Sequence, residues 1–180
     1  MKALNILTSL LMLGVLFLSC EPDDQPSSIA PAHPTQKYFE GYLSIDAIGG
    51  TPTGSLTMPS LDLRFSGEGQ SNLFSDIILE SSHKQLYVDD RSRYRIDSGE
   101  FLMTVKSGDA LFGVYDGYGV IQDKYHSIFE YYQIMGGTGR FQHASGNLTV
   151  QSHQLLDCSS RNATMVGTIV LDEFKDINRF

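Results

Sequence analysis

The chain has 180 residues, of which 41% are hydrophobic and 11% aromatic, enough for the core of one ordinary domain; a large multidomain enzyme is excluded. Thirteen Lys and Arg against 21 Asp and Glu give a net charge of −8, which argues against a protein that holds nucleic acid or anionic lipid by charge. Seventeen Gly, six Pro and no Trp, with stretches rich in Tyr, Phe, Val, Ile and Thr, favour strands and turns over helices.

The first 19 residues are predicted to be a lipoprotein signal peptide. Lys2 supplies the positive charge, and the apolar run from Leu10 to Leu18 ends at Ser19 and Cys20. That run is roughly half of the about 20 apolar residues that a transmembrane helix needs. The segment Phe17–Cys20 resembles the bacterial lipoprotein box, in which the Cys is acylated and becomes the mature N-terminus. We therefore expect Cys20 to carry palmitate or a similar acyl group and to anchor the protein in the lipid bilayer.

Residues 20–37 are predicted to be a flexible tether. Residues 21–37 hold four Pro and only Ile29 among the large aliphatic residues, so they cannot bury enough surface to fold. The acidic cluster Glu21–Asp24 resembles the export signal of surface lipoproteins of the Bacteroidetes; the alternative is a solvated acidic linker. The expected location is the cell envelope, at the outer membrane, with periplasmic and surface-exposed orientations both open.

The other Cys is expected to be structural. If Cys20 carries lipid, Cys158 has no partner for a disulfide or for a Cys-based metal site. A lone Cys is most often a small buried hydrophobe, which we favour over a nucleophile. His83, His143 and His153 are placed in loops or at strand ends, and no pair of His residues has the spacing of metal ligands. No metal and no other cofactor is expected.

Residues 38–180 are predicted to form one all-β domain. Period-two alternation and turn residues place strands at 38–46, 61–66, 73–80, 101–105, 110–115, 125–135, 144–150 and 164–171. Gly49–Gly54 is predicted to be a turn or loop, and Ser107–Asp109 a hairpin that pairs the strands beside it. Seven or eight short strands without a helix indicate an antiparallel sandwich or barrel, and a barrel leaves no exposed edge.

Two segments carry a more specific resemblance. Val105–Gly117 and Gly136–Gly146 together resemble a bacterial group of the allene oxide cyclase and dirigent-like barrel superfamily, and Gly67–Phe74 is similar to an earlier Gly- and Ser-rich segment of those proteins. The resemblance covers residues 38–172. It implies a single antiparallel barrel of eight strands with calycin-type architecture, and a homo-oligomer, since plant relatives are often dimeric or trimeric. No active-site residue of the plant proteins is matched here, and fold does not imply function.

The second of these segments is interpreted as a structural turn. Gly136, Gly137, Gly139 and Gly146 permit positive φ or close backbone approach, and Arg140 has five donors for carbonyl groups in a tight turn. The alternative is a phosphate-binding nest. The Lys-Ser/Thr pair and the helix that follow a P-loop are missing, so a turn between strands is favoured.

The catalytic candidates lie on the strand at 125–135. One face carries His126, Glu130 and Tyr132. In an apolar bore the pKa of Glu130 would be raised, so that Glu130 or His126 could act as a general acid or base while Tyr132 positions a substrate. The alternative, which we favour because Glu is seldom buried without a partner, is that the polar residues are exposed on the outer face. The hydrolase motif Gly-x-Ser-x-Gly is absent from the sequence.

The first functional hypothesis is a membrane-anchored envelope lipoprotein whose barrel binds a small apolar or aromatic ligand, or a partner, without catalysis. The alternatives are an isomerase- or cyclase-like enzyme that acts in the bore and a purely structural envelope module. No nucleic-acid partner is expected from the net charge of −8.

Overall fold

A computed structural model describes residues 34–54, 59–88, 92–155 and 160–172. The strands are β1 (Pro34–Gly54), β2 (Pro59–Ser71), β3 (Ser75–Val88), β4 (Arg93–Val105), β5 (Ala110–Gln122), β6 (Tyr125–Gly137), β7 (Ser145–Leu155) and β8 (Ser160–Asp172), with a short 3₁₀ helix, η1 (Gly139–Phe141). The predicted signal peptide, Cys20 and Cys158 lie outside the described residues. No helix in the part of the chain that is described is long and apolar enough to cross a membrane.

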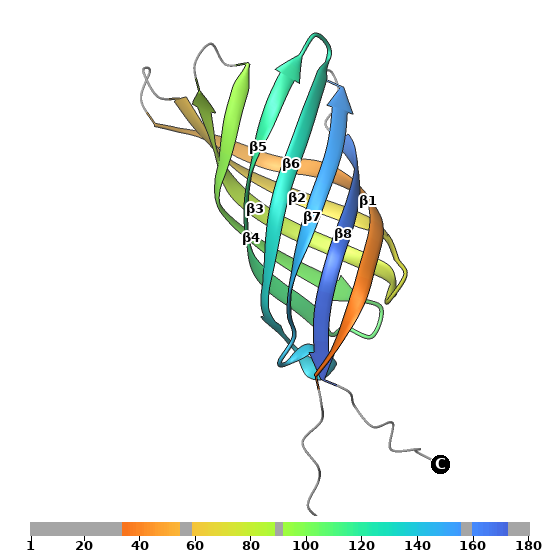
Figure 1. Ribbon diagram of the computed structural model, residues 1–180. Helices are drawn as coiled ribbons and strands as arrows, with labels where there is room; N and C mark the ends of the chain where they lie inside the picture. The colour runs from red at the N-terminus through yellow and green to blue at the C-terminus, as the bar shows by residue number, and fades with distance from the viewer. Residues whose placement is uncertain (1–33, 55–58, 89–91, 156–159, 173–180) are drawn as a thin grey trace, which may run out of the picture. The chain divides into compact units, whose positions relative to one another are not determined.

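The eight strands form one closed antiparallel barrel in chain order (Figure 1). Each strand pairs with the next, and β1 pairs with β8 from Pro34↔Asp172 to Asp46↔Ser160. Closure leaves no unpaired edge along these strands. The predicted all-β barrel is confirmed, and the sandwich is excluded.

Both ends of β1 differ from the sequence prediction. The strand begins at Pro34, inside the predicted tether, because the backbone of residues 34–38 pairs with β8 and this pairing does not require large apolar side chains. It also continues through Gly49–Gly54, the predicted turn, which pairs with β2 after a β-bulge between Ala47 and Gly49. A bulge bends a strand without ending it.

The predicted hairpin between β4 and β5 is confirmed. Leu102 to Thr104 pair with Phe112 to Ala110, and the backbone of Val105 bonds to both Gly108 and Asp109. Gly108 has φ +87°, a conformation that favours glycine.

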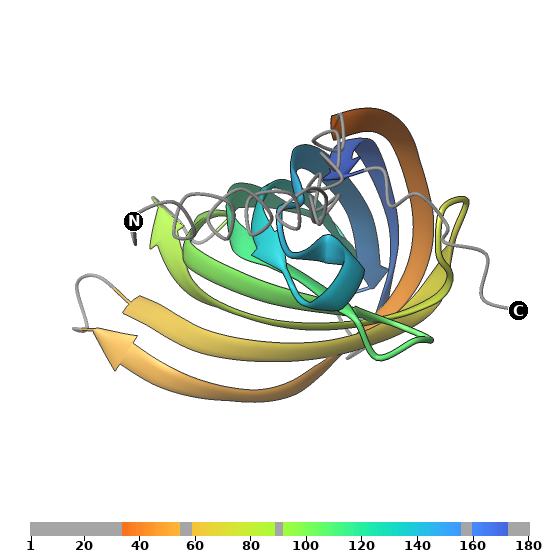
Figure 2. The same ribbon diagram turned by 90° about the horizontal axis from the view of Figure 1, so that it is seen from below.

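At one end of the barrel, where η1 lies (Figure 2), aromatic side chains pack together. Here η1 places Phe141 with its ring centroid 5.0 Å from that of Phe74, which lies 5.9 Å from Phe39. All three rings are buried. The start of β1 and the end of β8, where Pro34 pairs with Asp172, lie at this end (Figure 1).

The glycine-rich segment forms the turn that carries η1. Gly139 has φ +53°, a conformation that favours glycine, and a Cβ there would lie 1.9 Å from Asp109 Oδ1, so a larger residue would also displace the Asp109 side chain. The guanidinium of Arg140 lies 4.8 Å from the Phe141 ring, and its Nε lies 3.7 Å from Asp109 Oδ2. Arg140 thus links the turn to the β4–β5 hairpin through the Asp109 carboxylate and packs on a ring of its own turn, whereas the sequence suggested carbonyl groups as its partners.

Candidate functional site: a buried polar cluster

The inner face of the barrel changes from apolar to polar along its length. Near η1 it is built from Phe, Ile, Leu, Met and Val side chains. Further along the strands, polar residues occupy the same inward-facing positions. The polar cluster consists of Ser81 and His83 on β3, Tyr115 on β5, Glu130 and Tyr132 on β6, Ser152 on β7 and Arg161 on β8, all buried.

An ion pair joins two strands of this cluster. Arg161 Nη2 lies 3.0 Å from Glu130 Oε1, and their side chains are 2% and 0% exposed. Ser152 on β7, between the two strands, accepts a hydrogen bond of 3.3 Å from Arg161 Nη1. The guanidinium also lies 5.0 Å from the ring centroid of Phe65.

The favoured interpretation of Glu130 as an exposed outer-face residue was therefore wrong. Glu130 points inward, and the sequence argument that Glu needs a partner for burial is met by Arg161. The carboxylate faces a guanidinium, not the apolar wall on which the acid-base hypothesis depended.

Aromatic rings form the other side of the cluster. Tyr115 and Tyr132 are stacked with their centroids 4.4 Å apart and an interplanar angle of 7°. The Tyr132 ring also packs at 4.8 Å against Phe101. Gly99 makes room for this stack, because a Cβ at that position would lie 2.7 Å from the Tyr115 ring.

His83 is held in its neutral form. Its Nδ1 lies 2.8 Å from the Tyr115 hydroxyl, a hydrogen bond in which either atom can donate. Burial, with a further contribution from the positive charge of Arg161, lowers the pKa of His83 to about 3. Burial likewise raises the pKa of Tyr115 and Tyr132, so both phenols keep their protons at neutral pH. The cluster thus holds one cation and one anion, which are paired.

Five buried polar atoms of the cluster have no hydrogen-bond partner of ordinary geometry within the described chain, although the Ser81 hydroxyl lies near enough to Tyr132 to lower the pKa of that phenol against the larger effect of burial. They are Ser81 Oγ, His83 Nε2, Glu130 Oε2, Tyr132 OH and Arg161 Nε. Nearly all buried polar groups in proteins are hydrogen-bonded, so five in one place is an exception that needs a physical reason. Together they offer a fixed donor at Arg161, a fixed acceptor at Glu130, and groups that can do either.

His126 lies apart from these residues, toward the end of the barrel away from η1. It is half-buried, and its ring packs 5.9 Å from Tyr94, which packs 6.0 Å from Tyr87. Burial lowers the pKa of His126. The structure thus brings two of the three catalytic candidates, Glu130 and Tyr132, into the cluster and leaves His126 nearer the barrel mouth.

Sequence reasoning missed the residues that complete the cluster. His83 was placed in a loop or at a strand end, but it lies inside β3 and is buried. Arg161 was not considered, because its strand was predicted to begin at Thr164. The alternation along the strand could have revealed Arg161. It stands two and four residues before the buried Ala163 and Met165, and inward-facing positions repeat every second residue.

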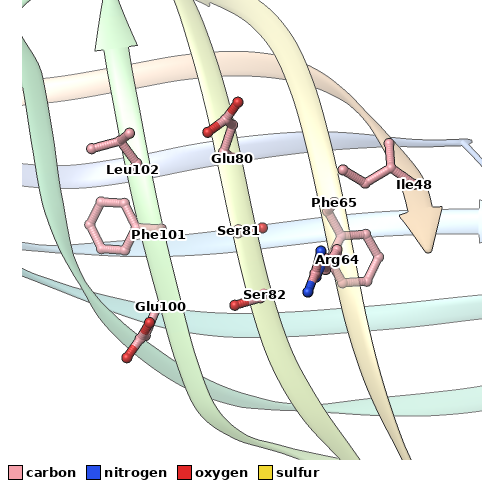
Figure 3. A pocket seen from close by; sticks show the side chains of 9 residues that line it. All are labelled: Ile48, Arg64, Phe65, Glu80, Ser81, Ser82, Glu100, Phe101 and Leu102. Carbon is pink, nitrogen blue, oxygen red and sulfur yellow. The ribbon is translucent and has the colours of Figure 1, made fainter. Parts of the chain in front are cut away.

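A groove of about 420 Å³ lies over β2, β3 and β4 (Figure 3). Arg64, Glu80 and Glu100 extend from the outer face of these strands. Ser81, whose hydroxyl belongs to the polar cluster, also lines this groove. No group of three His, Cys, Asp or Glu side chains that could hold a metal ion occurs among the described residues.

The fold and the site define the class of protein: a closed, eight-stranded antiparallel barrel with a buried polar cluster. No family model and no curated protein matches the sequence. Among solved structures, the chain is similar to a pterocarpan synthase dirigent protein, with a TM-score of 0.46 and 10% identity over 88% of this chain and 99% of that one. A likeness at this level establishes neither a shared family nor a shared activity.

Proposed function

We propose that the protein is a lipid-anchored barrel of the cell envelope that binds a small ligand at the polar cluster and does not transform it. The observation that carries this proposal is the set of five buried polar atoms without partners, grouped against stacked aromatic rings. Ligand sites in proteins typically combine aromatic walls with a few convergent polar groups.

The chemistry of the cluster indicates the kind of ligand. The tyrosine stack and Phe101 favour a planar or apolar body. Because Arg161 and Glu130 already neutralise each other and His83 is neutral, no net charge is available to hold an ion. The expected ligand is thus an uncharged aromatic or apolar molecule that carries at least one hydroxyl, carbonyl or amide group.

A second candidate function is an isomerase-like reaction at the same site. Glu130 Oε2 supports it, since this buried carboxylate oxygen has no partner in the described chain and could accept a proton from a bound substrate. Tyr132 OH, also without a partner, could return a proton or polarise a carbonyl group.

Native mass spectrometry tests the proposal. The purified protein is measured before and after incubation with an extract of its own cell envelope, and we expect one discrete added mass. Tyr132→Phe and Ser81→Ala remove hydroxyls from the cluster without creating a charge, and both should weaken retention of that mass. Tyr131→Phe is the matched control, because its ring is 50% exposed on the outer face of the same strand.

Equal retention by all four proteins, or no added mass from the extract, would contradict ligand binding at the cluster. A bound mass that converts with time to an isomer of different chromatographic retention, and does so only with Glu130 intact, would favour the isomerase.

The anchoring part of the proposal rests on the sequence motif around Cys20 and has its own test. Cells that express the protein are labelled with radioactive palmitate, and Cys20→Ser should abolish both labelling and recovery in the membrane fraction. Protease added to intact cells separates a surface orientation from a periplasmic one. An unlabelled wild-type protein would refute lipid anchoring and leave the barrel site untouched.

A further inference from the structure

The outer surface of the barrel is divided into a charged and an uncharged part. On β2, β3 and β4 the outward-facing positions include charged residues of both signs: Asp62, Arg64, Glu68, Asp76, Glu80, Lys84, Arg93, Arg95, Asp97 and Glu100. On β6, β7 and β8 no Asp, Glu, Lys or Arg faces outward between Tyr125 and Val170 in the described ranges. Three neighbouring strands without an outward-facing charge are unusual, since charged side chains make up about 25–35% of the surface of a typical soluble protein.

A groove of about 640 Å³ is lined by residues of this uncharged face and of the adjoining strand β1. We call it the amide groove, and its polar lining consists of Tyr42, Ser44, Gln151, His153, Asn162 and Thr164. Its volume lies within the roughly 300–1,000 Å³ typical of sites for small ligands.

The strand register arranges these side chains in two rows across three strands. In the first row Tyr42 pairs with Thr164, which pairs with Gln151. In the second row Ser44 pairs with Asn162, which pairs with His153. Directly opposite residues have Cβ atoms about 4.5–5.5 Å apart, so each row is a continuous line of hydrogen-bonding groups.

The groove combines hydrogen-bonding capacity with an aromatic ring. The side-chain amides of Gln151 and Asn162 each offer a donor pair and an acceptor, and the hydroxyls can do either. Tyr42 is 59% exposed, and its hydroxyl donates a hydrogen bond of 2.6 Å to Glu40 Oε1, which fixes the ring beside the groove. A fixed ring offers apolar area at a small cost in side-chain entropy.

We propose that the amide groove is a binding site for a neutral carbohydrate. Sugar rings carry closely spaced hydroxyls, each a donor and an acceptor, around C–H faces that pack on aromatic rings; the two polar rows and Tyr42 match both features. Because no Lys or Arg lines the groove, a phosphate or acidic sugar would bring a charge without a guanidinium or ammonium partner. The net charge of −8 opposes the approach of anions and of a second copy of this chain.

The amide groove is independent of the polar cluster. Its polar lining residues face outward, whereas those of the cluster face the barrel interior, because side chains alternate between the faces of a sheet. Loss of one binding activity therefore leaves the other in place, and the two proposals can fail separately.

Isothermal titration calorimetry with the purified protein tests the site. The probes are maltohexaose, cellohexaose, xylohexaose and mannohexaose, with oligogalacturonate as the acidic counterpart. We expect at least one neutral probe to bind with a Kd of about 1 mM or tighter, a binding free energy of roughly −4 kcal/mol. Oligogalacturonate should bind at least ten times more weakly than that probe.

Substitutions locate the binding. Gln151→Ala and Asn162→Ala should each weaken binding about tenfold or more, and Tyr42→Ala should do the same. Asn147→Ala is the matched control, because this exposed amide lies on β7 outside the amide groove and should leave the Kd unchanged. Urea midpoints equal to that of the wild type show that the variants are folded.

Three results would overturn the proposal. One is that none of the four neutral probes binds with a Kd near 1 mM. Another is that the groove variants bind as tightly as the wild type. The third is light scattering that shows a dimer which Gln151→Ala dissociates, because the groove would then be an interface between two copies.

Discussion

Replacement of Arg161 by Met would leave Glu130 as an unpaired carboxylate in the barrel interior. In the wild type the two atoms of the pair lie 3.0 Å apart, and the Glu130 side chain has no exposed surface. Removing one partner of such a pair costs about 3–5 kcal/mol, because the remaining charge keeps its desolvation penalty and loses its counterion. In a domain of this size each kcal/mol of lost stability lowers Tm by about 2–4 °C, so the Tm of Arg161→Met should be roughly 6–20 °C below that of the wild type.

The pH dependence of the same variant follows from the unpaired carboxylate. An isolated buried carboxylate favours its protonated form, so folded Arg161→Met binds a proton more readily than the unfolded chain does. Its stability should therefore rise relative to the wild type as the pH falls from about 7 to 4. Urea unfolding followed by circular dichroism at both pH values measures the difference.

Two further variants make the result specific. Glu130→Met combined with Arg161→Met replaces both charges by apolar side chains and should recover most of the loss, since apolar replacement of a buried pair is often neutral or stabilising. Arg95→Met breaks the exposed pair with Asp97, whose side chains are 64% and 46% exposed, and should cost about 0–1 kcal/mol. The reasoning is refuted if Arg161→Met costs less than about 1 kcal/mol, or if the double variant is less stable than the single one.

Three other predictions concern His83, two glycines and three buried tyrosines. The pKa of folded His83 is about 3 against the ordinary 6.5, so between these values the unfolded chain binds a proton that the folded chain does not. Lowering the pH from 7 to 5 should therefore reduce the free energy of unfolding by about 2 kcal/mol through this residue. In urea unfolding at the two pH values, His83→Gln should lose correspondingly less stability than the wild type. Gly117→Ala should lower the free energy of unfolding in urea by about 1–3 kcal/mol, since its Cβ would lie 2.2 Å from the Phe129 carbonyl oxygen. Gly49→Ala is the control: nothing lies within 4 Å of its Cβ, so its stability should stay within about 0.5 kcal/mol of the wild type. In an absorbance titration at 295 nm, Tyr94, Tyr115 and Tyr132 should ionise only on unfolding, because burial raises the pKa of each. Above pH about 10 the unfolded chain loses these protons while the folded chain keeps them, so stability falls as the pH rises further. A titration in which all nine Tyr ionise while circular dichroism is unchanged would contradict this.

The sequence predicted the apolar half of the barrel better than the polar half. Apolar alternation defined the strands wherever Phe, Leu, Ile, Met and Val face inward. In β3 the inward-facing residues after Leu79 are Ser81, His83 and Gln85, so the alternation of hydrophobicity disappears while the strand continues to Val88. The predicted strand accordingly ended at Glu80. The polar residues of the candidate site thus interrupt the alternation of hydrophobicity by which the strand would have been recognised.

The ion pair was hidden for a related reason. Glu130 and Arg161 are 31 residues apart and lie on β6 and β8, which are neighbours of β7 and not of each other. No local pattern joins them. Once the barrel is known, the inference is direct: an inward-facing Glu needs a cation, and Arg161 is in phase with inward-facing residues of β8. The ion pair could therefore be identified only after the order of the strands in the barrel was known.

The double variant also separates a structural from a functional role of the cluster. A buried ion pair is weak evidence for stability, because apolar side chains of similar size can fill the same space at no loss. If Glu130→Met with Arg161→Met folds as stably as the wild type and still retains the ligand mass, the ion pair is needed neither for stability nor for binding, and the ligand is held by the other polar groups of the cluster. If the double variant folds as stably as the wild type but no longer retains the ligand mass, the carboxylate and the guanidinium at the centre of the barrel are explained by ligand binding and not by stability.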